Sequence, residues 1–368
     1  MNTKSNKKAY FFGFSRWKHA FIHPFFPEYS KENLIFINPL LRTHYDLALK
    51  KGLDCRSDIY IWGKKSFLEV EEFALNNSLN IYRVEDGFIR SVGLGSDLTQ
   101  PYSQVIDSRG IYFDPTHESD LEYYLNHYDF VKNKTLLKRA LRLKEEIIKN
   151  KISKYNADAI QKLVFPQDKV VALVVGQVED DASIRYGAPS MTNMKLLQEV
   201  RKKYPEHYLV FKPHPDVLSG NRIGDIDKEE ALRYCNEIIQ DISISDVLQA
   251  VDEVHTMTSL SGFEGLLYEK KVFTYGLPFY AGWGLTNDNI ACERRQRDLK
   301  LEELIAATYF LYPRYINPLS KEICEPEIVV KALKTQRDLL ANSFFLRTKS
   351  KIYSYLSRII QKLLSLVG

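Results

Sequence analysis

The chain has few cysteines, and none of them are close together in the sequence. The four are Cys55, Cys235, Cys292 and Cys324, in a chain of 368 residues. A zinc-binding knuckle needs cysteines paired at short spacing, and a disulfide-stapled domain needs a high density of them. The spacing argues against both classes and is typical of a protein in a reducing compartment.

The chain also lacks long apolar segments and several well-known catalytic motifs. No stretch approaches the roughly 18 apolar residues of a membrane-spanning helix. The apolar stretch of residues 9–14 is too short for the core of a signal peptide, so we expect a cytoplasmic protein. No P-loop, G-x-G-x-x-G, H-E-x-x-H or G-x-S-x-G motif is present, which removes support for ATP hydrolysis, zinc proteolysis and α/β-hydrolase chemistry.

The excess of charge is small and lies at the end of the chain. Lys and Arg total 51 against 47 for Asp and Glu, and a net charge of +4 is too small to suggest a nucleic-acid binder. Residues 343–368 contain five cations and no acid, and their apolar residues recur at three- and four-residue steps. This pattern predicts an amphipathic helix, which either lies in a membrane interface or packs on the fold.

What the chain does contain is typical of a globular α/β protein. Hydrophobic residues make up 45% and charged residues 27%, and the length favours about two domains. Short β-rich segments alternate with helix-capable ones, which predicts doubly wound, Rossmann-like lobes with parallel sheets. The expected strands are 9–14, 34–38, 58–63, 80–84, 170–175, 208–212, 254–257 and 271–275. The predicted domains are residues 1–165, including a helical linker, residues 166–330, and C-terminal helices over 331–368.

Polar side chains follow three of the expected strands in the second lobe. Glu179, Asp180 and Asp181 follow the first of these strands, and K-P-H-P-D at 212–216 follows the second. The sequence T-S-L-S-G at 258–262 follows the third and precedes a helix, where free N–H groups favour an anion. Ligands of open α/β sheets bind beyond the carboxyl ends of the strands, so together these loops suit a nucleotide-linked substrate.

Each of these features also has a purely structural interpretation. An acidic triplet is often a solvated loop, a histidine between prolines is often a rigid turn, and hydroxyls before a helix are often N-caps. In the first lobe, Glu85 and Asp86 precede Gly87 and could form a simple turn. Arg90 and Arg109 could pair with these acids or bind an anionic substrate.

Eight segments together resemble the capsular polysaccharide β-Kdo transferase family over roughly residues 10–330. They are G-F-S-R-W-K (13–18), E-D-G-F-I-R-S-V-G-L-G (85–95), D-S-R-G-I-Y-F-D (107–114), D-D-A-S-I-R-Y-G (180–187), K-P-H-P-D-V (212–217), T-S-L-S-G-F-E-G-L-L (258–267), G-L-P-F-Y-A-G-W-G-L-T (276–286) and L-Y-P-R-Y (311–315). The large capsule enzymes of this family carry two modules. This chain has one, and its G-Q-V-E-D-D-A-S is more similar to the second module.

The resemblance implies a GT-B-type fold, with two lobes facing a cleft, and a retaining transferase. Such an enzyme moves 3-deoxy-D-manno-oct-2-ulosonic acid (Kdo) from CMP-β-Kdo to a Kdo- or glycan-bearing lipid. It implies a peripheral protein at the inner face of the cytoplasmic membrane, with capsule assembly proteins as partners. We expect no cofactor, no catalytic metal and no nucleic-acid partner.

The resemblance also implies roles for individual residues. Asp181 would be the nucleophile, with Asp180 as the alternative, and an ordinary aspartate with a pKa of about 4 is ionised at neutral pH. His214 would face the departing phosphate, and Glu85 would activate the acceptor hydroxyl. The residues expected to bind substrate or nucleotide are Lys212, Ser259, Ser261, Gly262, Glu264, Arg185, Arg90 and Arg109.

Two rival functions remain open at this point. A GT-B-like nucleotide-sugar epimerase would use the same two lobes and the same histidine loop without an acceptor. A relative without catalytic activity could instead serve as a module in capsule assembly or export. Release of free CMP only in the presence of an acceptor would distinguish a transferase from both.

Overall fold

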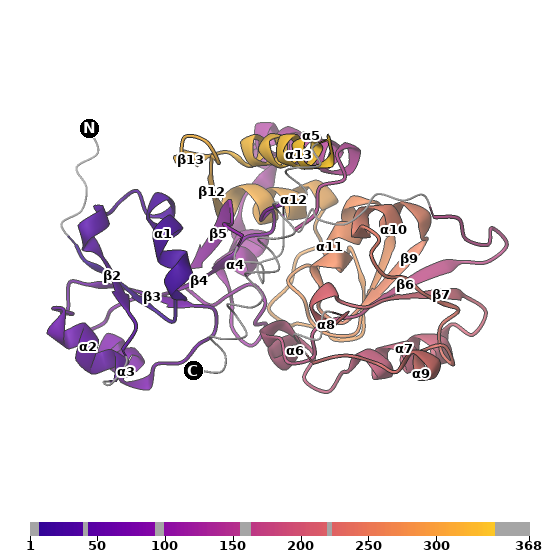
Figure 1. Ribbon diagram of the computed structural model, residues 1–368, viewed down its shortest axis with the longest axis horizontal. Helices are drawn as coiled ribbons and strands as arrows, with labels where there is room; N and C mark the ends of the chain where they lie inside the picture. Colours follow the sequence, from indigo (N-terminus) through magenta and orange to yellow (C-terminus); the bar gives the residue numbers. More distant parts are fainter. Residues whose placement is uncertain (1–6, 40–42, 93–98, 155–162, 219–222, 343–368) are drawn as a thin grey trace. The chain divides into compact units, whose positions relative to one another are not determined.

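The computed structural model describes residues 7–39, 43–92, 99–154, 163–218 and 223–342 (Figure 1). The predicted amphipathic helix of residues 343–368 lies outside this part of the chain. The chain divides into two compact units, one of Met1–Ile111 with Tyr312–Gly368 and the other of Tyr112–Leu311. All eight predicted strands are confirmed, with ends within two residues of those expected.

The first unit is built on a seven-stranded sheet with the order β13-β12-β5-β4-β3-β1-β2. Its strands are β1 (Ala9–Phe12), β2 (Leu34–Ile37), β3 (Asp58–Trp62), β4 (Ile81–Asp86), β5 (Ser103–Asp107), β12 (Pro313–Ile316) and β13 (Ile323–Cys324). Strands β4, β3, β1 and β2 are parallel, as predicted, whereas β5, β12 and β13 join the sheet through antiparallel pairs. The antiparallel strands are an addition to the doubly wound pattern.

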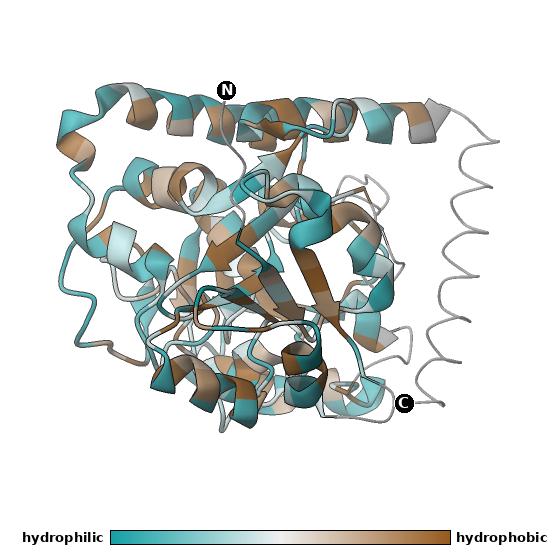
Figure 2. Cartoon of the chain, turned by 90° about the vertical axis from the view of Figure 1, so that its left-hand side faces the viewer, coloured by the Kyte–Doolittle hydropathy of each residue, from teal (hydrophilic) through white to brown (hydrophobic). Residues whose placement is uncertain are grey.

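Alternating residues of the parallel strands cover both faces of this sheet. Phe11 packs on one face with Phe14, Phe26 and Tyr60. The neighbouring residues Tyr10 and Phe12 point to the other face, as the two-residue period of a strand requires. The helices of this unit are α1 (His19–Ile22), α2 (His44–Lys50), α3 (Leu68–Asn76) and α13 (Pro326–Asn342). In Figure 2 the strands are mostly hydrophobic and α13 alternates hydrophilic and hydrophobic residues.

The second unit is built on a six-stranded, wholly parallel sheet with the order β11-β10-β9-β6-β7-β8. Its strands are β6 (Val171–Val175), β7 (Tyr208–Lys212), β8 (Glu237–Ile238), β9 (Glu253–Thr256), β10 (Lys271–Thr274) and β11 (Asn287–Asp288). Its helices are α4 (Asp120–His127), α5 (Lys134–Lys149), α6 (Ala182–Gly187), α7 (Asn193–Lys203), α8 (Pro215–Leu218), α9 (Lys228–Ala231), α10 (Ile244–Ala250), α11 (Leu260–Leu267) and α12 (Leu301–Ala306). All five residues of β6 are buried, as expected for a strand covered on both faces. In Figure 1, α7 and α9 lie on one side of β6 and β7, and α10 lies on the other.

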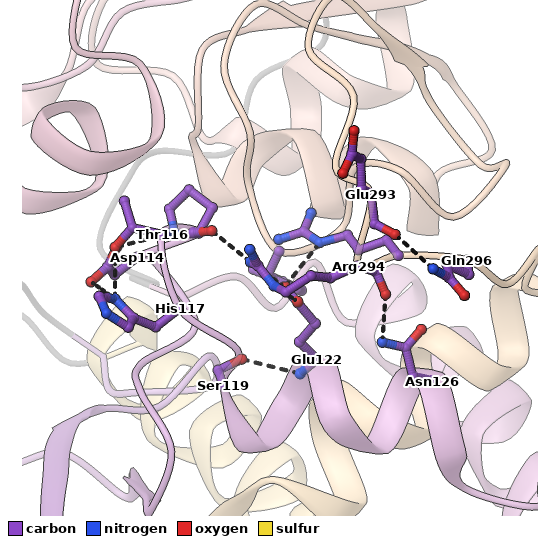
Figure 3. Close-up of polar contacts among 12 residues, drawn as sticks. Asp114, Thr116, His117, Ser119, Glu122, Asn126, Glu293, Arg294 and Gln296 are labelled. Carbon is purple, nitrogen blue, oxygen red and sulfur yellow. Dashed lines mark hydrogen bonds and ion pairs between the residues drawn. The ribbon is translucent and has the colours of Figure 1, made fainter.

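The division of the chain differs from the predicted boundaries at residues 165 and 330. Helix α4 packs within the second unit because its buried Glu122 accepts hydrogen bonds from Arg294 Nε at 2.7 Å and Arg295 Nε at 3.1 Å (Figure 3). Asn126 of the same helix donates to the Arg294 carbonyl at 2.9 Å. These bonds join segments about 170 residues apart, so short-range sequence patterns gave no sign of them.

Helix α5 also belongs to the second unit. Its buried residues Leu136, Ala140, Leu143 and Ile147 recur at helical spacing, and the helix packs against α12. The Arg139 guanidinium lies 4.7 Å from the centre of the Phe310 ring in the same unit. The segment predicted as a linker of the first lobe is therefore part of the core of the second unit.

Candidate functional site

Three polar loops lie side by side at one edge of the second sheet. Strand β6 is flanked by β7 on one side and β9 on the other, and all three strands are parallel. Their carboxyl ends therefore meet at the same edge of the sheet, where α/β proteins bind ligands. The loops that follow them contain Asp181, His214 and Ser259, as the sequence predicted.

Asp181 is the N-cap of helix α6. Its Oδ1 accepts hydrogen bonds from the Ser183 backbone N–H at 2.9 Å and from Ser183 Oγ at 2.7 Å. The side chain is half-buried, because the cap holds it against the start of the helix. Asp180 and Arg185 are exposed. The cap fixes one oxygen of the Asp181 carboxylate and so orients the whole group.

Glu179, the first acid of the triplet, has a structural role. Its Oε1 accepts a hydrogen bond from the backbone N–H of Asn193, the first residue of α7, at 2.8 Å. Such a bond satisfies an N–H that the helix itself leaves without a partner. The triplet is therefore not a uniform solvated loop, because its members differ in burial and in bonding.

Gln177 joins two of the three loops, and sequence reasoning missed it. Its Oε1 accepts from the Thr258 backbone N–H at 2.8 Å, and its Nε2 donates to Thr258 Oγ1 at 3.0 Å. Its own backbone N–H donates to Asn193 Oδ1 at 2.8 Å. Gln177 thus fixes the loop after β6 to the loop after β9. In the sequence it directly follows Gly176, within the segment G-Q-V-E-D-D-A-S.

His214 is held in one orientation by its own loop. The Asp216 backbone N–H donates to Nδ1 of the ring at 3.1 Å, and Asp216 Oδ2 lies 4.0 Å from the same nitrogen. A ring nitrogen that accepts a hydrogen bond carries no proton, so the neutral ring has its proton on Nε2. The ring can therefore donate from Nε2. Lys212, at the end of β7, is half-buried.

Ser259 and Gly262 shape the start of helix α11. Ser259 is the N-cap, and its Oγ accepts from the Ser261 backbone N–H at 3.1 Å. The Tyr280 hydroxyl donates to the Ser259 carbonyl at 2.5 Å. A Cβ atom on Gly262 would lie 2.2 Å from that hydroxyl oxygen, so only glycine fits there. The N-cap interpretation holds for Ser259, and nucleotide binding by Ser259, Ser261 and Gly262 stays a prediction.

Glu264 is buried within α11. Its Oε1 accepts a hydrogen bond from the Lys154 backbone N–H at 3.2 Å. Burial raises the pKa of this carboxyl to about 7, because a charge there is poorly solvated. In the described part of the chain, Glu264 thus fastens α11 to the segment that follows α5, and a contact with nucleotide stays a prediction.

In the first unit, the acids at the end of β4 are embedded among cations. Arg90 is fully buried, and its Nε donates to Asp86 Oδ2 at 2.7 Å, so of the two alternatives for Arg90 the structure shows the ion pair. Lys18 Nζ lies 3.8 Å from Asp86 Oδ1 and 3.1 Å from the centre of the Trp62 ring. Burial lowers the pKa of Lys18, while Asp86 and Glu85 oppose the shift. Sequence reasoning missed Lys18, although it ends the G-F-S-R-W-K motif.

Glu85 lies near the carboxyl end of β4, and its Oε1 accepts from the Asp86 backbone N–H at 3.0 Å. A Cβ atom on Gly63, at the end of β3, would lie 3.1 Å from Glu85 Oε2, and Gly63 has a φ of +56°. The glycine therefore leaves room for the carboxylate at the edge of this sheet. Arg109 is exposed, and its backbone N–H donates to Asp107 Oδ1 at 3.0 Å.

Comparison with known proteins gives a consistent result. Residues 57–315 match a family described as capsule polysaccharide biosynthesis protein. The capsule polysaccharide modification protein LipA of Neisseria meningitidis serogroup B is 45% identical over 343 residues, which are 93% of this chain and 47% of LipA. The lipopolysaccharide-processing protein LpsZ of Rhizobium meliloti is 43% identical over 280 residues, which are 75% of this chain and 64% of LpsZ. The chain spans about half the length of LipA.

Two solved structures from Thermosulfurimonas dismutans match nearly the whole chain. KpsC, β-Kdo 2,7 transferase, is 36% identical with a TM-score of 0.71, covering 90% of this chain and 100% of that one. KpsC, β-Kdo 2,4 transferase, is 32% identical with a TM-score of 0.76, covering 90% and 98%. The predicted α/β fold of the GT-B type and the predicted family resemblance are both confirmed.

Proposed function

Because the chain belongs to the capsule polysaccharide biosynthesis protein family, we propose that it is a retaining β-Kdo glycosyltransferase that uses CMP-β-Kdo. The observation that carries the proposal is the meeting of Asp181, His214 and the start of α11 at one sheet edge. The carboxylate suits attack on a sugar carbon. The ring N–H suits donation to a leaving phosphate, and the helix start suits a nucleotide. The two T. dismutans transferases supply the donor sugar by analogy.

The proposed reaction has two displacements. In the first, an Asp181 oxygen attacks the anomeric carbon, the bond from that carbon to the phosphate oxygen breaks, and CMP leaves. In the second, the acceptor hydroxyl attacks the same carbon while Glu85 takes its proton, and the bond to Asp181 breaks. Two inversions retain the configuration, as in retaining glycosidases. Substrate or nucleotide contacts are proposed for Lys212, Arg185 and Arg109.

The phosphate that departs with CMP needs stabilisation, which we assign to His214 and the first turn of α11. A donated hydrogen bond and the helix dipole both stabilise charge that develops on phosphate oxygens. Neither requires a metal ion, so the proposal includes no cofactor. The acceptor proposed is a lipid-linked Kdo or glycan, met at the inner face of the cytoplasmic membrane. Within the described part of the chain, none of the helices is long and apolar enough to span a membrane.

The first prediction tests the nucleophile with Asp181→Asn. An asparagine oxygen still accepts from Ser183 as an N-cap, so α6 should remain intact while the attacking carboxylate is lost. We expect turnover to fall by several orders of magnitude with CMP binding nearly unchanged. The assay follows free CMP made from CMP-Kdo, generated in place, with and without a Kdo-bearing acceptor.

Asp180→Asn is the matched control, because Asp180 is the exposed neighbour. It should retain most of the wild-type turnover, and the reverse result would move the role to Asp180. CMP release without any acceptor would contradict a transferase. Epimerisation in place of transfer, or no turnover at all, would favour one of the two rival functions. NMR of the product would give both the linkage and the anomeric configuration.

The second prediction concerns His214. His214→Ala should weaken CMP binding and slow turnover together, because one Nε2–H would serve both the bound and the departing phosphate. Isothermal titration calorimetry measures the affinity for CMP, and the CMP-release assay measures turnover. Unchanged CMP affinity would show that His214 serves only as a turn residue in its loop.

A further inference from the structure

A pocket of about 610 Å³ in the first unit is separate from the residues of the proposed reaction. It lies at the outer strand β2 of the sheet, where Asn38 follows the strand. Arg16 and His19, which follow β1, line it from the neighbouring strand, and Lys51 lines it from the end of α2. The pocket thus runs along the edge strand β2, from Leu34 at the start of the strand to Asn38 just beyond its carboxyl end.

The polar side of the pocket is cationic. Arg16 and Lys51 are both exposed, and Lys51 Nζ donates to the Phe36 carbonyl at 3.1 Å, which holds the ammonium at the pocket. None of the described residues that line the pocket is acidic. A group bound here would therefore meet two positive charges with no carboxylate beside them.

His19 adds a fixed polar group without adding charge. Its ring stacks on Phe36 with centroids 3.9 Å apart and planes 12° apart, and its Nε2 lies 3.1 Å from Asn38 Nδ2. Burial lowers the pKa of His19, the backbone hydrogen bond to Phe14 opposes this shift, and the positive charges of Arg16 and Lys51 add to it. A lowered pKa favours the neutral ring, so the charge of the pocket comes from the arginine and the lysine.

The other side of the pocket is apolar. Leu34, Ile35 and Phe36 of β2 and Leu47 of α2 complete the lining. A small hydrophilic anion would leave these apolar side chains uncovered, and an uncharged amphiphile would leave the two positive charges uncompensated. The two halves together match a ligand with an anionic head and an apolar chain.

We propose that this pocket binds an anionic amphiphile, a phosphate head group with an attached apolar chain. In the order β4-β3-β1-β2, Asn38 at the carboxyl end of the pocket lies on the same edge of the sheet as Glu85, with β3 and β1 between them. The pocket would then hold the lipid-phosphate end of the acceptor while its sugar end extends along the edge toward Glu85. This assignment to the acceptor rests on the proposed function, whereas binding of the amphiphile does not.

Direct binding tests the ligand class with three probes. These are n-octyl phosphate below its critical micelle concentration, inorganic phosphate, and n-octyl glucoside, each titrated into the full chain by calorimetry. We expect octyl phosphate to bind at least tenfold more tightly than either of the other two. Equal binding of inorganic phosphate would show a free-phosphate site, equal binding of octyl glucoside would show a merely apolar one, and either would overturn the proposal.

Variants test whether the pocket is the site of binding. Arg16→Gln and Lys51→Gln, alone and together, should each weaken octyl phosphate binding severalfold, and Lys50→Gln should not. Lys50 is the matched control because it is exposed, directly precedes Lys51 and lies outside the lining. Because Lys51 also donates a hydrogen bond to the Phe36 carbonyl, thermal unfolding of each variant is measured to show that the fold is kept. Arg16→Gln tests the pocket without loss of that bond. Unchanged binding in the folded double variant would overturn the proposal.

Transfer kinetics test the link to the acceptor. In the double variant, KM for a lipid-phosphate acceptor should rise at least tenfold, with kcat unchanged and with KM for a soluble acceptor without phosphate unchanged. Equal effects on both acceptors would overturn the assignment to the acceptor. If wild-type protein binds octyl phosphate but transfers Kdo to neither acceptor, the proposed function fails and the binding site stands.

Discussion

Gly262 lies at the start of α11 in the candidate site, and its lack of a side chain leaves room for Tyr280. A Cβ atom there would lie 2.2 Å from Tyr280 Oη and 2.7 Å from Tyr280 Cζ, distances that no ordinary contact allows. Gly262→Ala should therefore destabilise the protein by about 1–3 kcal/mol or displace Tyr280 from the Ser259 carbonyl. Urea unfolding measures the loss of stability, and CMP calorimetry reports on the loop.

Gly265→Ala on the same helix is the control for this prediction. Its Cβ would lie 3.1 Å from Val254 Cγ2, a contact that a small shift can relieve, and the helix gains propensity from alanine in both variants. Gly265→Ala should therefore cost clearly less than Gly262→Ala. Equal losses would show that the close approach of Tyr280 is not what requires glycine at 262.

The placement of a site residue could be predicted where the residue belongs to a motif that follows a predicted strand. It could not be predicted where the residue contacts a partner far away in the sequence. Asp181, His214 and Ser259 follow predicted strands, so strand order alone brings them to one edge. Gln177 contacts Thr258, which is 81 residues away, and Lys18 faces Asp86 through packing of the first sheet. Neither contact produces a periodic pattern in the sequence.

At the scale of elements, α11 and the segment after α5 are joined by a carboxyl group that titrates near neutral pH. The folded pKa of Glu264, about 7 through burial, is above the ordinary value of 4.5, so the folded state holds the proton more tightly than the unfolded state. The stability from this proton is complete below pH 4.5 and is lost as the pH rises through about 7. A shift of this size corresponds to about 3 kcal/mol at pH 8.

Glu264→Gln should remove most of that pH dependence. An amide carries no charge at either pH, and its oxygen can still accept from the Lys154 N–H. Between pH 5 and pH 8, the free energy of unfolding should fall less in the variant than in the wild type, as measured by urea titration. Glu145→Gln, an exposed change on α5, is the control and should follow the wild type. Parallel curves for Glu264→Gln and wild type would contradict the elevated pKa.

Strands were predictable from the sequence where they consist mostly of apolar residues. The wholly apolar β6 and the apolar segment of β1 were found from the sequence, because both lie in sheet interiors. Strands β5 and β12 were missed. β5 reads S-Q-V-I-D with polar residues at both ends, and β12 begins with Pro313. Proline is tolerated at the first position of a strand, but it is rare within strands, so its presence argued against predicting a strand there.

At the scale of the whole molecule, the two units differ in how the chain builds them. The second unit is one continuous segment, Tyr112–Leu311, whereas the first joins two separate segments. The difference from the predicted boundary at 165 arises from α4 and α5. Their apolar faces resemble those of any surface helix, so the sequence cannot say which sheet they cover. The packing of α5 on α12 decides that question.

The fragment 112–311 should therefore fold on its own and bind CMP, whereas 166–311 should not fold cooperatively. The shorter fragment loses Glu122 and so leaves the guanidinium of Arg295, which is nearly buried, without its carboxylate. Loss of one partner of a buried ion pair costs about 3–5 kcal/mol, and removal of α5 also exposes the apolar surface of α12. Urea unfolding followed by circular dichroism tests folding, and calorimetry tests CMP affinity. If the fragment 112–311 folds but does not bind CMP, part of the nucleotide site belongs to the first unit. A cooperative unfolding transition in the fragment 166–311 would show that the second sheet folds without α4 and α5.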